Sequence, residues 1–216
     1  MTAASCGGRA DQPHDDASQS QSSDAHRGAA TTRVLIIGTS LTAGLGLNPD
    51  DAYPAVLQHI ADSAGAHATI VNAGVSGETS AGALRRVDWL MSEPADIVVI
   101  ETGANDGLRG LDPDSTTANL RGIIAGVRAK APNAKIVLAQ MEALPNLGPA
   151  YTRRFHDMYP RVAKESNAAL MPFLLDGVGG VAALNQADGI HPTERGALRV
   201  AANVWKTLGP LLGAVK

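Results

Sequence analysis

The sequence has few cysteines, few aromatic residues and no long apolar run, and each of these shortages excludes a class of protein. A single cysteine, Cys6, cannot form a disulfide within the chain, and it leaves the redox compartment open. Aromatic residues make up only 3% of the sequence, too few for a platform that stacks bases or sugars. No apolar run approaches the roughly 18 residues that a membrane span needs. Disulfide-stabilised, base-stacking and membrane-spanning proteins are therefore not expected.

The charge balance also argues against nucleic acid as a partner. The net charge is −3 and the sequence pI is about 6.0, so no basic surface is expected to attract phosphates. Hydrophobic residues make up 44% and charged residues 18%, the composition of a globular protein with a sizeable core. At 216 residues, one large domain is the simplest organisation.

The first 32 residues differ from the rest of the chain. From Cys6 to about Thr32 there is almost no large apolar side chain, so this stretch cannot bury enough surface to offset its ordering entropy. We predict a disordered tail over residues 1–32 and a folded domain over residues 33–216. His14, Asp15 and Asp16 in the tail are interpreted as solvated side chains and not as a metal site.

The first six residues resemble part of an export signal. The segment Thr2-Ala3-Ala4-Ser5-Cys6 resembles the end of a bacterial lipoprotein signal, in which small residues precede a lipidated cysteine. Two features depart from that pattern: Ala3 replaces the usual aliphatic residue, and no hydrophobic region precedes it in this sequence. We expect a periplasmic protein, or one tethered to the envelope membrane through Cys6 with the tail as linker. A cytoplasmic protein with an ordinary tail is the alternative.

From residue 33 onward, strand-like apolar runs alternate with amphipathic helix-like stretches. This alternation predicts an α/β domain with a parallel sheet covered on both faces, and right-handed crossovers place the strands in one sheet. The carboxyl ends of the first three strands then meet at one edge, where the loops are rich in glycine and small polar residues. The five strands are expected at residues 34–37, 69–72, 96–100, 136–139 and 169–173.

Ser40 is the candidate nucleophile. The run of apolar residues 34–37 is typical of a strand buried on both faces, and Gly38 ends it. The serine follows directly, at the carboxyl end of a strand, where open α/β sheets bind their ligands. The turn alone does not exclude a plainer role, in which Thr39 or Ser40 caps a helix.

A serine nucleophile needs a base, and His191 is the candidate. It lies in Asp188-Gly189-Ile190-His191-Pro192, a polar loop before the last predicted helix, where Asp188 can fold back to hold the imidazole. The alternative is that Asp188-Gly189 is a simple turn. The other histidines lie in the tail or on helices and are interpreted as surface residues without a polar cluster: His14, His26, His59, His67 and His156.

Three hydrogen-bond donors at the same edge could stabilise an oxyanion. They are the backbone N–H of Ser40, the backbone N–H of Gly77 and the side-chain amide of Asn105. Gly77 lacks a Cβ, so a substrate can approach its amide closely. Taken alone, Asn105 is better explained as stabilising its own turn.

Four short segments, in order along the chain, resemble the SGNH (GDSL-type) hydrolase family. They are Gly38-Thr39-Ser40-Leu41, Ser76-Gly77-Glu78-Thr79, Gly103-Ala104-Asn105-Asp106 and Asp188-Gly189-Ile190-His191-Pro192. The loop over residues 105–110 is similar to the bacterial arylesterase, thioesterase and lysophospholipase branch. The resemblance spans residues 33 to the C-terminus.

The resemblance implies a flavodoxin-like, three-layer α/β/α sandwich with a five-stranded parallel sheet in the order 2-1-3-4-5. It implies that Ser40 is the nucleophile, His191 the base and then acid, and Asp188 the residue that orients His191. Ser40, Gly77 and Asn105 would form the oxyanion hole. No metal and no organic cofactor is implied.

This chain departs from the family at Thr39, where an aspartate is usual. A threonine hydroxyl can replace only part of the hydrogen bonding of a carboxylate. We therefore expect retained activity, a somewhat altered turn, and one negative charge fewer beside the oxyanion.

The expected activity is that of a serine esterase acting on small-molecule carboxylic esters through an acyl-serine intermediate. Aryl and short-to-medium acyl esters are the expected substrates, together with thioesters or lysophospholipids. Leu108, Met141, Leu144 and Pro145 are the candidate substrate-binding residues, although ordinary packing explains them equally well. The alternatives are a carbohydrate O-acetyl esterase, a phosphate or flavin binder on the same fold, and a non-catalytic interaction module.

Overall fold

The computed structural model describes residues 1, 2, 4 and 31–213. Five parallel strands form one sheet in the order β2-β1-β3-β4-β5, as predicted. The strands are β1 (Thr32–Gly38), β2 (Ala68–Gly74), β3 (Ile97–Ile100), β4 (Lys135–Ala139) and β5 (Ala169–Met171). The lipoprotein-like Cys6 and the acidic cluster at residues 14–16 lie outside the described residues.

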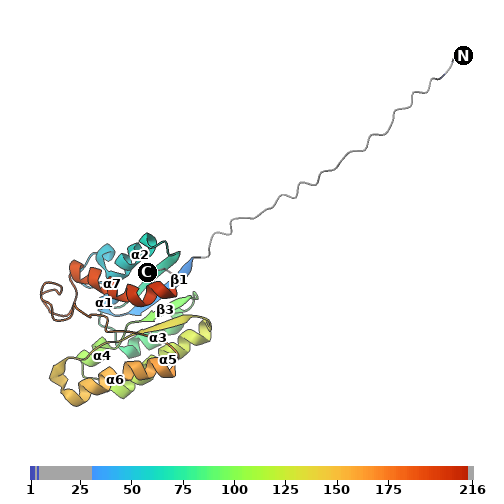
Figure 1. Ribbon diagram of the computed structural model, residues 1–216. Coiled ribbons are helices and arrows are strands. Elements are labelled where there is room, and N and C mark those ends of the chain that lie inside the picture. Colours follow the sequence, from blue (N-terminus) through green and yellow to red (C-terminus); the bar gives the residue numbers. More distant parts are fainter. Residues whose placement is uncertain (3, 5–30, 214–216) are drawn as a thin grey trace.

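Helices cover both faces of this sheet (Figure 1). α2 packs against α7 on one face, while α5 packs between α3 and α6 on the other. The predicted three-layer sandwich is confirmed. Its helices are α1 (Ser40–Ala43), α2 (Tyr53–Ser63), α3 (Ser80–Leu90), α4 (Ala104–Leu108), α5 (Pro113–Lys130), α6 (Pro149–Glu165) and α7 (Glu194–Leu211), with two 3-10 helices, η1 (Pro49–Asp51) and η2 (Pro145–Leu147).

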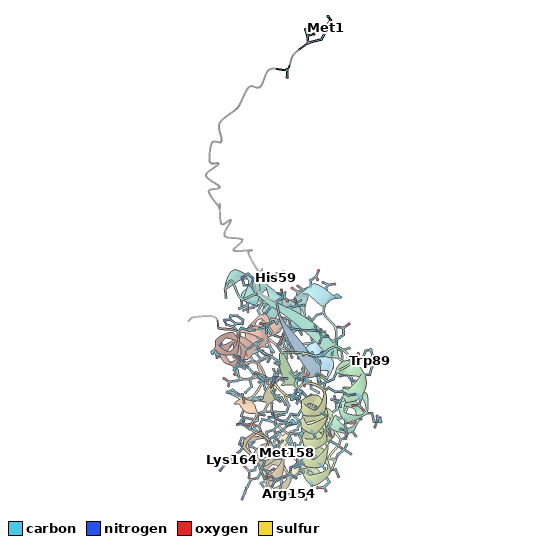
Figure 2. All side chains as sticks on the ribbon, turned by 90° about the vertical axis from the view of Figure 1, so that its right-hand side faces the viewer. Met1, His59, Trp89, Arg154, Met158 and Lys164 are labelled. Carbon is cyan, nitrogen blue, oxygen red and sulfur yellow. The ribbon has the colours of Figure 1, made fainter. Side chains whose placement is uncertain are left out.

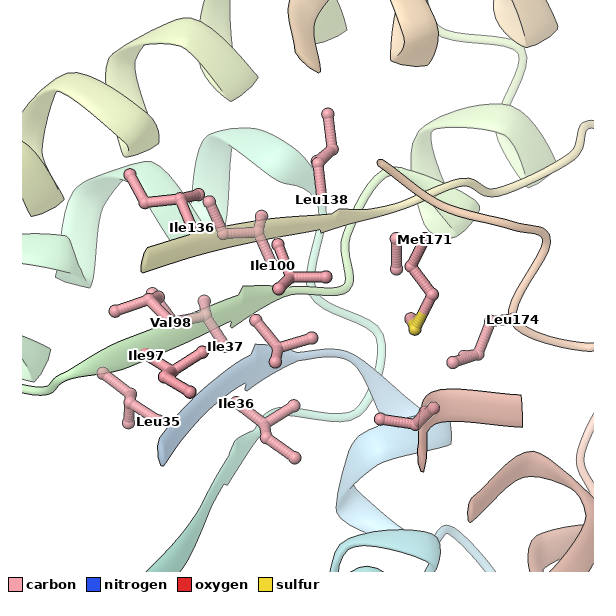
Figure 3. Close-up of a cluster of buried hydrophobic side chains, with 14 of the residues drawn as sticks. Leu35, Ile36, Ile37, Ile97, Val98, Ile100, Ile136, Leu138, Met171 and Leu174 are labelled. Atoms are coloured by element: carbon pink, nitrogen blue, oxygen red, sulfur yellow. The ribbon is translucent and has the colours of Figure 1, made fainter. Parts of the chain in front are cut away.

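The central strands form the core. Every residue of β3 is buried, as is β1 from Val34 onward, because the two neighbouring strands are covered by helices on both sides (Figure 3). Near-continuous apolar runs are what such strands require. The burial therefore explains why these two segments carry the strongest strand signals in the sequence.

The element ends differ from the predicted ones by one to three residues. β1 begins at Thr32, one residue before the predicted domain start, and β5 ends at Met171, before the predicted Phe173. The helices α1 and α4 were not predicted, because four or five residues are too few to show a helical period. Ala64 is exposed because α2 ends one residue earlier, at Ser63.

The outer helix surfaces are polar, with a few isolated exceptions. Figure 2 shows His59 and Trp89 at the periphery, and both are exposed. His67 is exposed as well, as predicted for both histidines. Among the residues that the structure describes, none of the helices could span a bilayer.

The carboxyl ends of β1, β2 and β3 meet closely. Gly38 pairs with Gly74 across β1 and β2, and the Glu101 N–H donates to the Ile37 carbonyl at 2.8 Å. A Cβ on Gly74 would lie 2.3 Å from the Ala43 backbone nitrogen, so only glycine lets α1 pack so tightly on β2. The first turn after β1 is thus enclosed by its two neighbouring strands.

Candidate active site

Ser40, His191 and Asp188 form a hydrogen-bonded chain. The Ser40 hydroxyl lies 2.9 Å from His191 Nε2, and Asp188 Oδ2 lies 2.6 Å from His191 Nδ1. Ser40 opens α1 directly after β1, while the other two residues lie in the loop that precedes α7. The fold thus joins two segments that are 151 residues apart in the sequence.

The loop holds Asp188 in place with backbone groups. Its Oδ1 accepts the N–H groups of Ile190 at 2.9 Å and His191 at 3.0 Å. The hydrogen bond from the His191 ring, aided by these two, lowers the pKa of Asp188 to about 2. Asp188 is therefore ionised across the neutral range and can orient the imidazole.

The Asp188 loop is also tied to the segment after α1. Gln186 donates its side-chain amide to the Leu45 carbonyl at 2.7 Å, and its backbone N–H to the His191 carbonyl at 2.7 Å. These bonds fix the distance between the histidine and the serine turn.

Three donors face the space beside Ser40. Within the described residues, the backbone N–H groups of Ser40 and Gly77 donate to no protein acceptor. Asn105 Nδ2 donates to the Glu78 carbonyl at 3.0 Å, which orients the amide and leaves its second hydrogen free. Ser40, Gly77 and Asn105 all line the same cavity, so the geometry allows one oxygen atom to meet all three.

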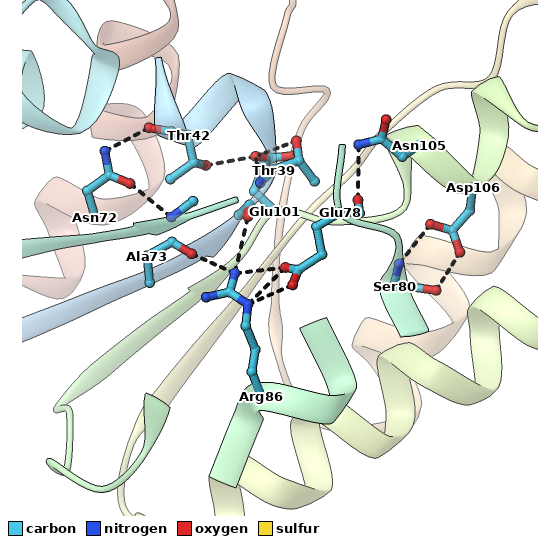
Figure 4. Close-up of polar contacts among 12 residues, drawn as sticks. Thr39, Thr42, Asn72, Ala73, Glu78, Ser80, Arg86, Glu101, Asn105 and Asp106 are labelled. Carbon is cyan, nitrogen blue, oxygen red and sulfur yellow. Dashed lines mark hydrogen bonds and ion pairs between the residues drawn. The ribbon is translucent and has the colours of Figure 1, made fainter. Parts of the chain in front are cut away.

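The loops that carry these donors are braced by charged side chains (Figure 4). Arg86 pairs with Glu78 at 2.7 Å and donates to the Ala73 carbonyl at 2.6 Å. Arg109 donates to the Gly77 carbonyl at 2.9 Å. These contacts hold the Gly77 turn, whose φ of +77° suits glycine.

A second brace comes from a buried carboxylate. Asp106, next to Asn105, accepts the Ser80 backbone N–H at 2.8 Å and its hydroxyl at 2.5 Å (Figure 4). This pair joins α4 to the start of α3. It therefore fixes the spacing between Asn105 and the Gly77 loop.

A cavity of about 390 Å³ opens beside the serine. Of the predicted substrate-binding residues, Leu108, Met141 and Leu144 line it, but Pro145 does not, because the chain turns into η2 at that residue. Other lining residues were not predicted, although Phe173 and Leu175 follow the fifth strand and could have been expected at this edge. The missed residues are Leu41, Leu45, Glu142, Ala143, Phe173, Leu175, Gly179, Gly180 and Ile190.

The turn at Thr39 has a partner that the sequence did not predict. Thr39 donates its N–H and its hydroxyl to Glu101, each at 2.9 Å. Glu101 follows β3 and is completely buried. Burial raises the pKa of this carboxyl to about 7, against the opposing effect of its hydrogen bonds from Thr39 and Thr42.

The surroundings of His156 differ from those expected. This residue was expected to lack polar neighbours, but its Nδ1 lies 2.8 Å from Glu142 Oε1 and 2.9 Å from Gln140 Nε2. α6 carries it across to the segment after β4, a contact that local sequence cannot reveal.

In the part of the chain that the structure describes, no group of three or more histidine, cysteine or acidic residues could hold a metal ion.

The fold and the site define a class of enzyme. Residues 36–199 match the model of the GDSL-like lipase/acylhydrolase family, and the chain belongs to that family. The family predicted from the four segments is thereby confirmed. The class is that of serine esterases on a parallel α/β sheet.

Particular relatives agree with this class. The chain is 44% identical over 186 residues to esterase TesA of Pseudomonas aeruginosa, covering 85% of this chain and 91% of that protein. It is 37% identical over 187 residues to thioesterase 1/protease 1/lysophospholipase L1 of Escherichia coli, covering 86% and 88%. The crystal structure of the psychrotrophic esterase EstA from Pseudoalteromonas sp. matches with a TM-score of 0.80 at 32% identity, covering 84% and 99%.

Proposed function

We propose that Ser40, His191 and Asp188 are the catalytic residues of this esterase, and that it cleaves carboxylic esters through an acyl-serine intermediate. The observation that carries the proposal is the unbroken chain from Ser40 Oγ through His191 to Asp188 at the wall of an apolar cavity. A hydroxyl that shares a hydrogen bond with an imidazole can pass its proton to that imidazole as it attacks.

In the first step, Ser40 Oγ bonds to the ester carbonyl carbon while its proton moves to His191 Nε2. The carbonyl oxygen becomes an oxyanion and accepts hydrogen bonds from Ser40 N, Gly77 N and Asn105 Nδ2. When the carbon–oxygen bond to the alcohol breaks, the histidine returns the proton to the leaving oxygen. Asp188 stays ionised and keeps Nδ1 protonated.

In the second step, water replaces the alcohol. His191 Nε2 takes a proton from the water as its oxygen attacks the acyl-serine carbonyl, and the same three donors hold the second oxyanion. Breaking the acyl–Oγ bond returns the proton to Ser40 and releases the acid. The enzyme is restored without a change in oxidation state.

The substrate class follows from the cavity walls. Leu108, Met141, Leu144 and Phe173 give an apolar lining that suits an alkyl or aryl group. We propose aryl esters and esters of short-to-medium acyl chains, with thioesters or lysophospholipids as further substrates. The thioesterase and lysophospholipase named in the E. coli relative support that range.

A panel of p-nitrophenyl esters from acetate to decanoate tests this proposal. Wild-type protein should hydrolyse several of them, and Ser40→Ala should reduce kcat by at least about 10⁴-fold while the protein stays folded. Ser63→Ala, which removes an exposed hydroxyl on α2, is the matched control and should leave kcat unchanged. Comparable rates in Ser40→Ala and wild type would refute the assignment of Ser40.

We also infer that the protein works in the cell envelope, attached through a lipid on Cys6. The small residues of Ala3-Ala4-Ser5-Cys6 support this inference. Mass spectrometry of the protein isolated from its own cells should find a diacylglyceryl group on Cys6 as the first residue. A peptide in which residues 1–5 precede an unmodified Cys6 would contradict it.

A further inference from the structure

We propose that Glu101 is a positioning residue for the esterase reaction: it holds the Thr39–Ser40 peptide unit so that the Ser40 N–H points into the oxyanion site. The inference rests on the proposed function, because it assigns that N–H to the oxyanion hole. Glu101 touches neither the cavity nor the reacting atoms. It acts through Thr39.

The contacts of Glu101 converge on the turn that carries the nucleophile. Its carboxylate accepts the Thr39 N–H and hydroxyl, each at 2.9 Å, and the Thr42 hydroxyl at 2.7 Å (Figure 4). All three side chains are buried, so water does not compete for these bonds. Both donor residues belong to the turn and to α1, which begins at Ser40.

The peptide unit between Thr39 and Ser40 is held from both sides. The Thr39 carbonyl accepts the Ala43 N–H at 2.9 Å, and the N–H of this same peptide unit is that of Ser40. Glu101 fixes Thr39 from the other side, through its backbone nitrogen and hydroxyl. With both ends held, the plane of the peptide and the direction of the Ser40 N–H cannot rotate freely.

The surroundings are shaped to admit this carboxylate. A Cβ on Gly38 would lie 1.9 Å from Thr42 Oγ1 and 2.8 Å from Glu101 Oε2, so a side chain there would displace the contact. Tyr53 on α2 adds a hydrogen bond of 2.8 Å between its hydroxyl and Thr42 Oγ1. β1, β3 and α2 therefore meet α1 at this one carboxylate.

A buried carboxylate is costly for folding, which argues against a purely structural role. Moving a charged group out of water costs free energy unless its partners compensate fully. Glutamine has nearly the same shape without that cost. A side chain that served packing alone would therefore be replaceable by glutamine with no loss of rate.

The variant Glu101→Gln separates positioning from packing. We expect kcat for a soluble p-nitrophenyl ester to fall by about 10- to 100-fold, less than the loss of a whole oxyanion donor. KM should stay within about threefold, because the cavity is untouched. The Tm at pH 8 should not fall. A kcat within twofold of wild type, or a rate loss that merely follows a lowered Tm, would overturn the proposal.

Thr39→Val provides a second test that does not depend on changing Glu101. Valine keeps the buried shape but removes the hydroxyl donor, and we expect kcat to fall about fivefold or more with KM unchanged. In the double variant with Glu101→Gln, the loss should be no greater than in Glu101→Gln alone, because both changes break one contact. If the fold-losses in kcat of the two single variants multiplied in the double variant, Thr39 and Glu101 would act independently, and the proposal would be contradicted.

Thr117→Val is the matched control. Thr117 is also buried, and its hydroxyl donates to the Pro113 carbonyl at 2.7 Å, within α5. This variant should lose no activity. Should Ser40→Ala hydrolyse the ester as fast as wild type, the proposed function fails; should Ser40 be essential while Glu101→Gln and Thr39→Val stay fully active, only the present proposal fails.

Discussion

At the scale of single residues, the site depends on hydrogen bonds whose partners are far apart in the chain. Asp188 and His191 are held within one loop, but the serine comes from the opposite end of the domain. One oxyanion donor is the N–H of the serine itself, and the other two come from the Gly77 loop and from α4. The side-chain donor is separately testable, because Asn105→Ala removes its amide and leaves the two backbone donors in place.

Asn105→Ala tests the side-chain donor. We expect kcat to fall by roughly 10²–10³-fold, the usual cost of removing one oxyanion donor. Asn119→Ala is a fitting control: its amide bonds Ser80 Oγ at 2.9 Å in the same cluster, yet it does not line the cavity. Steady-state kinetics with one ester would measure both. Equal losses in the two variants would mean that Asn105 only braces its loop.

Removing the imidazole tests the base. Since the pKa of Asp188 is lowered to about 2, this carboxylate stays ionised above pH 5 and keeps the imidazole oriented. Without the imidazole the serine proton has no acceptor, so His191→Ala should reduce kcat by at least about 10³-fold. A kcat equal to that of wild type would exclude His191 as the base.

At the scale of secondary-structure elements, the junction of β1, α1 and β3 is the critical feature. Gly38 leaves room for the Glu101 carboxylate, and Gly74 lets α1 pack closely on β2. The sequence predicted that these strands end at one edge. It did not predict this contact, because a glutamate after an apolar run is usually interpreted as a surface residue; only the register of β3 against β1 places it inside.

The buried Glu101 predicts how stability depends on pH. Its pKa is raised from 4.5 to about 7 on folding, so the folded state binds the proton more tightly. Stability due to this group is therefore greatest below pH 4.5 and is lost as the pH rises through 7. The full change amounts to about 3 kcal/mol. Urea unfolding at pH 5 and pH 8 should show Glu101→Gln gaining stability relative to wild type at the higher pH; parallel behaviour would contradict the raised pKa.

At the scale of the whole molecule, the sheet brings five separate loops to one opening. The alternation of strand-like apolar runs with amphipathic helical stretches was enough to predict a sheet covered by helices on both faces. The family resemblance added the strand order. The cavity walls were predicted only in part. Leu108, Met141 and Leu144 were named, but Leu45 and Ile190 were not, because loop residues carry no periodicity that would reveal which of them face inward.

The apolar cavity predicts a preference for longer acyl chains. Each added methylene that is buried contributes about 0.8 kcal/mol, so the butyrate ester should exceed the acetate ester in kcat/KM by roughly tenfold. Leu144→Ser should reduce this ratio, whereas Pro145→Ala, just outside the cavity, should not. Kinetics with the two esters would decide. An unchanged ratio in Leu144→Ser would place the acyl group elsewhere.

Covalent trapping of the nucleophile is the sharpest test of the catalytic role of Ser40. A p-nitrophenyl alkylphosphonate should release one p-nitrophenolate per molecule of wild-type protein, and peptide mass spectrometry should find the phosphonate on Ser40. Ser40→Ala should take up none, and His191→Ala should react at least about 10³-fold more slowly. Stoichiometric labelling of another residue, or undiminished labelling of Ser40→Ala, would contradict the assignment of Ser40 as the nucleophile.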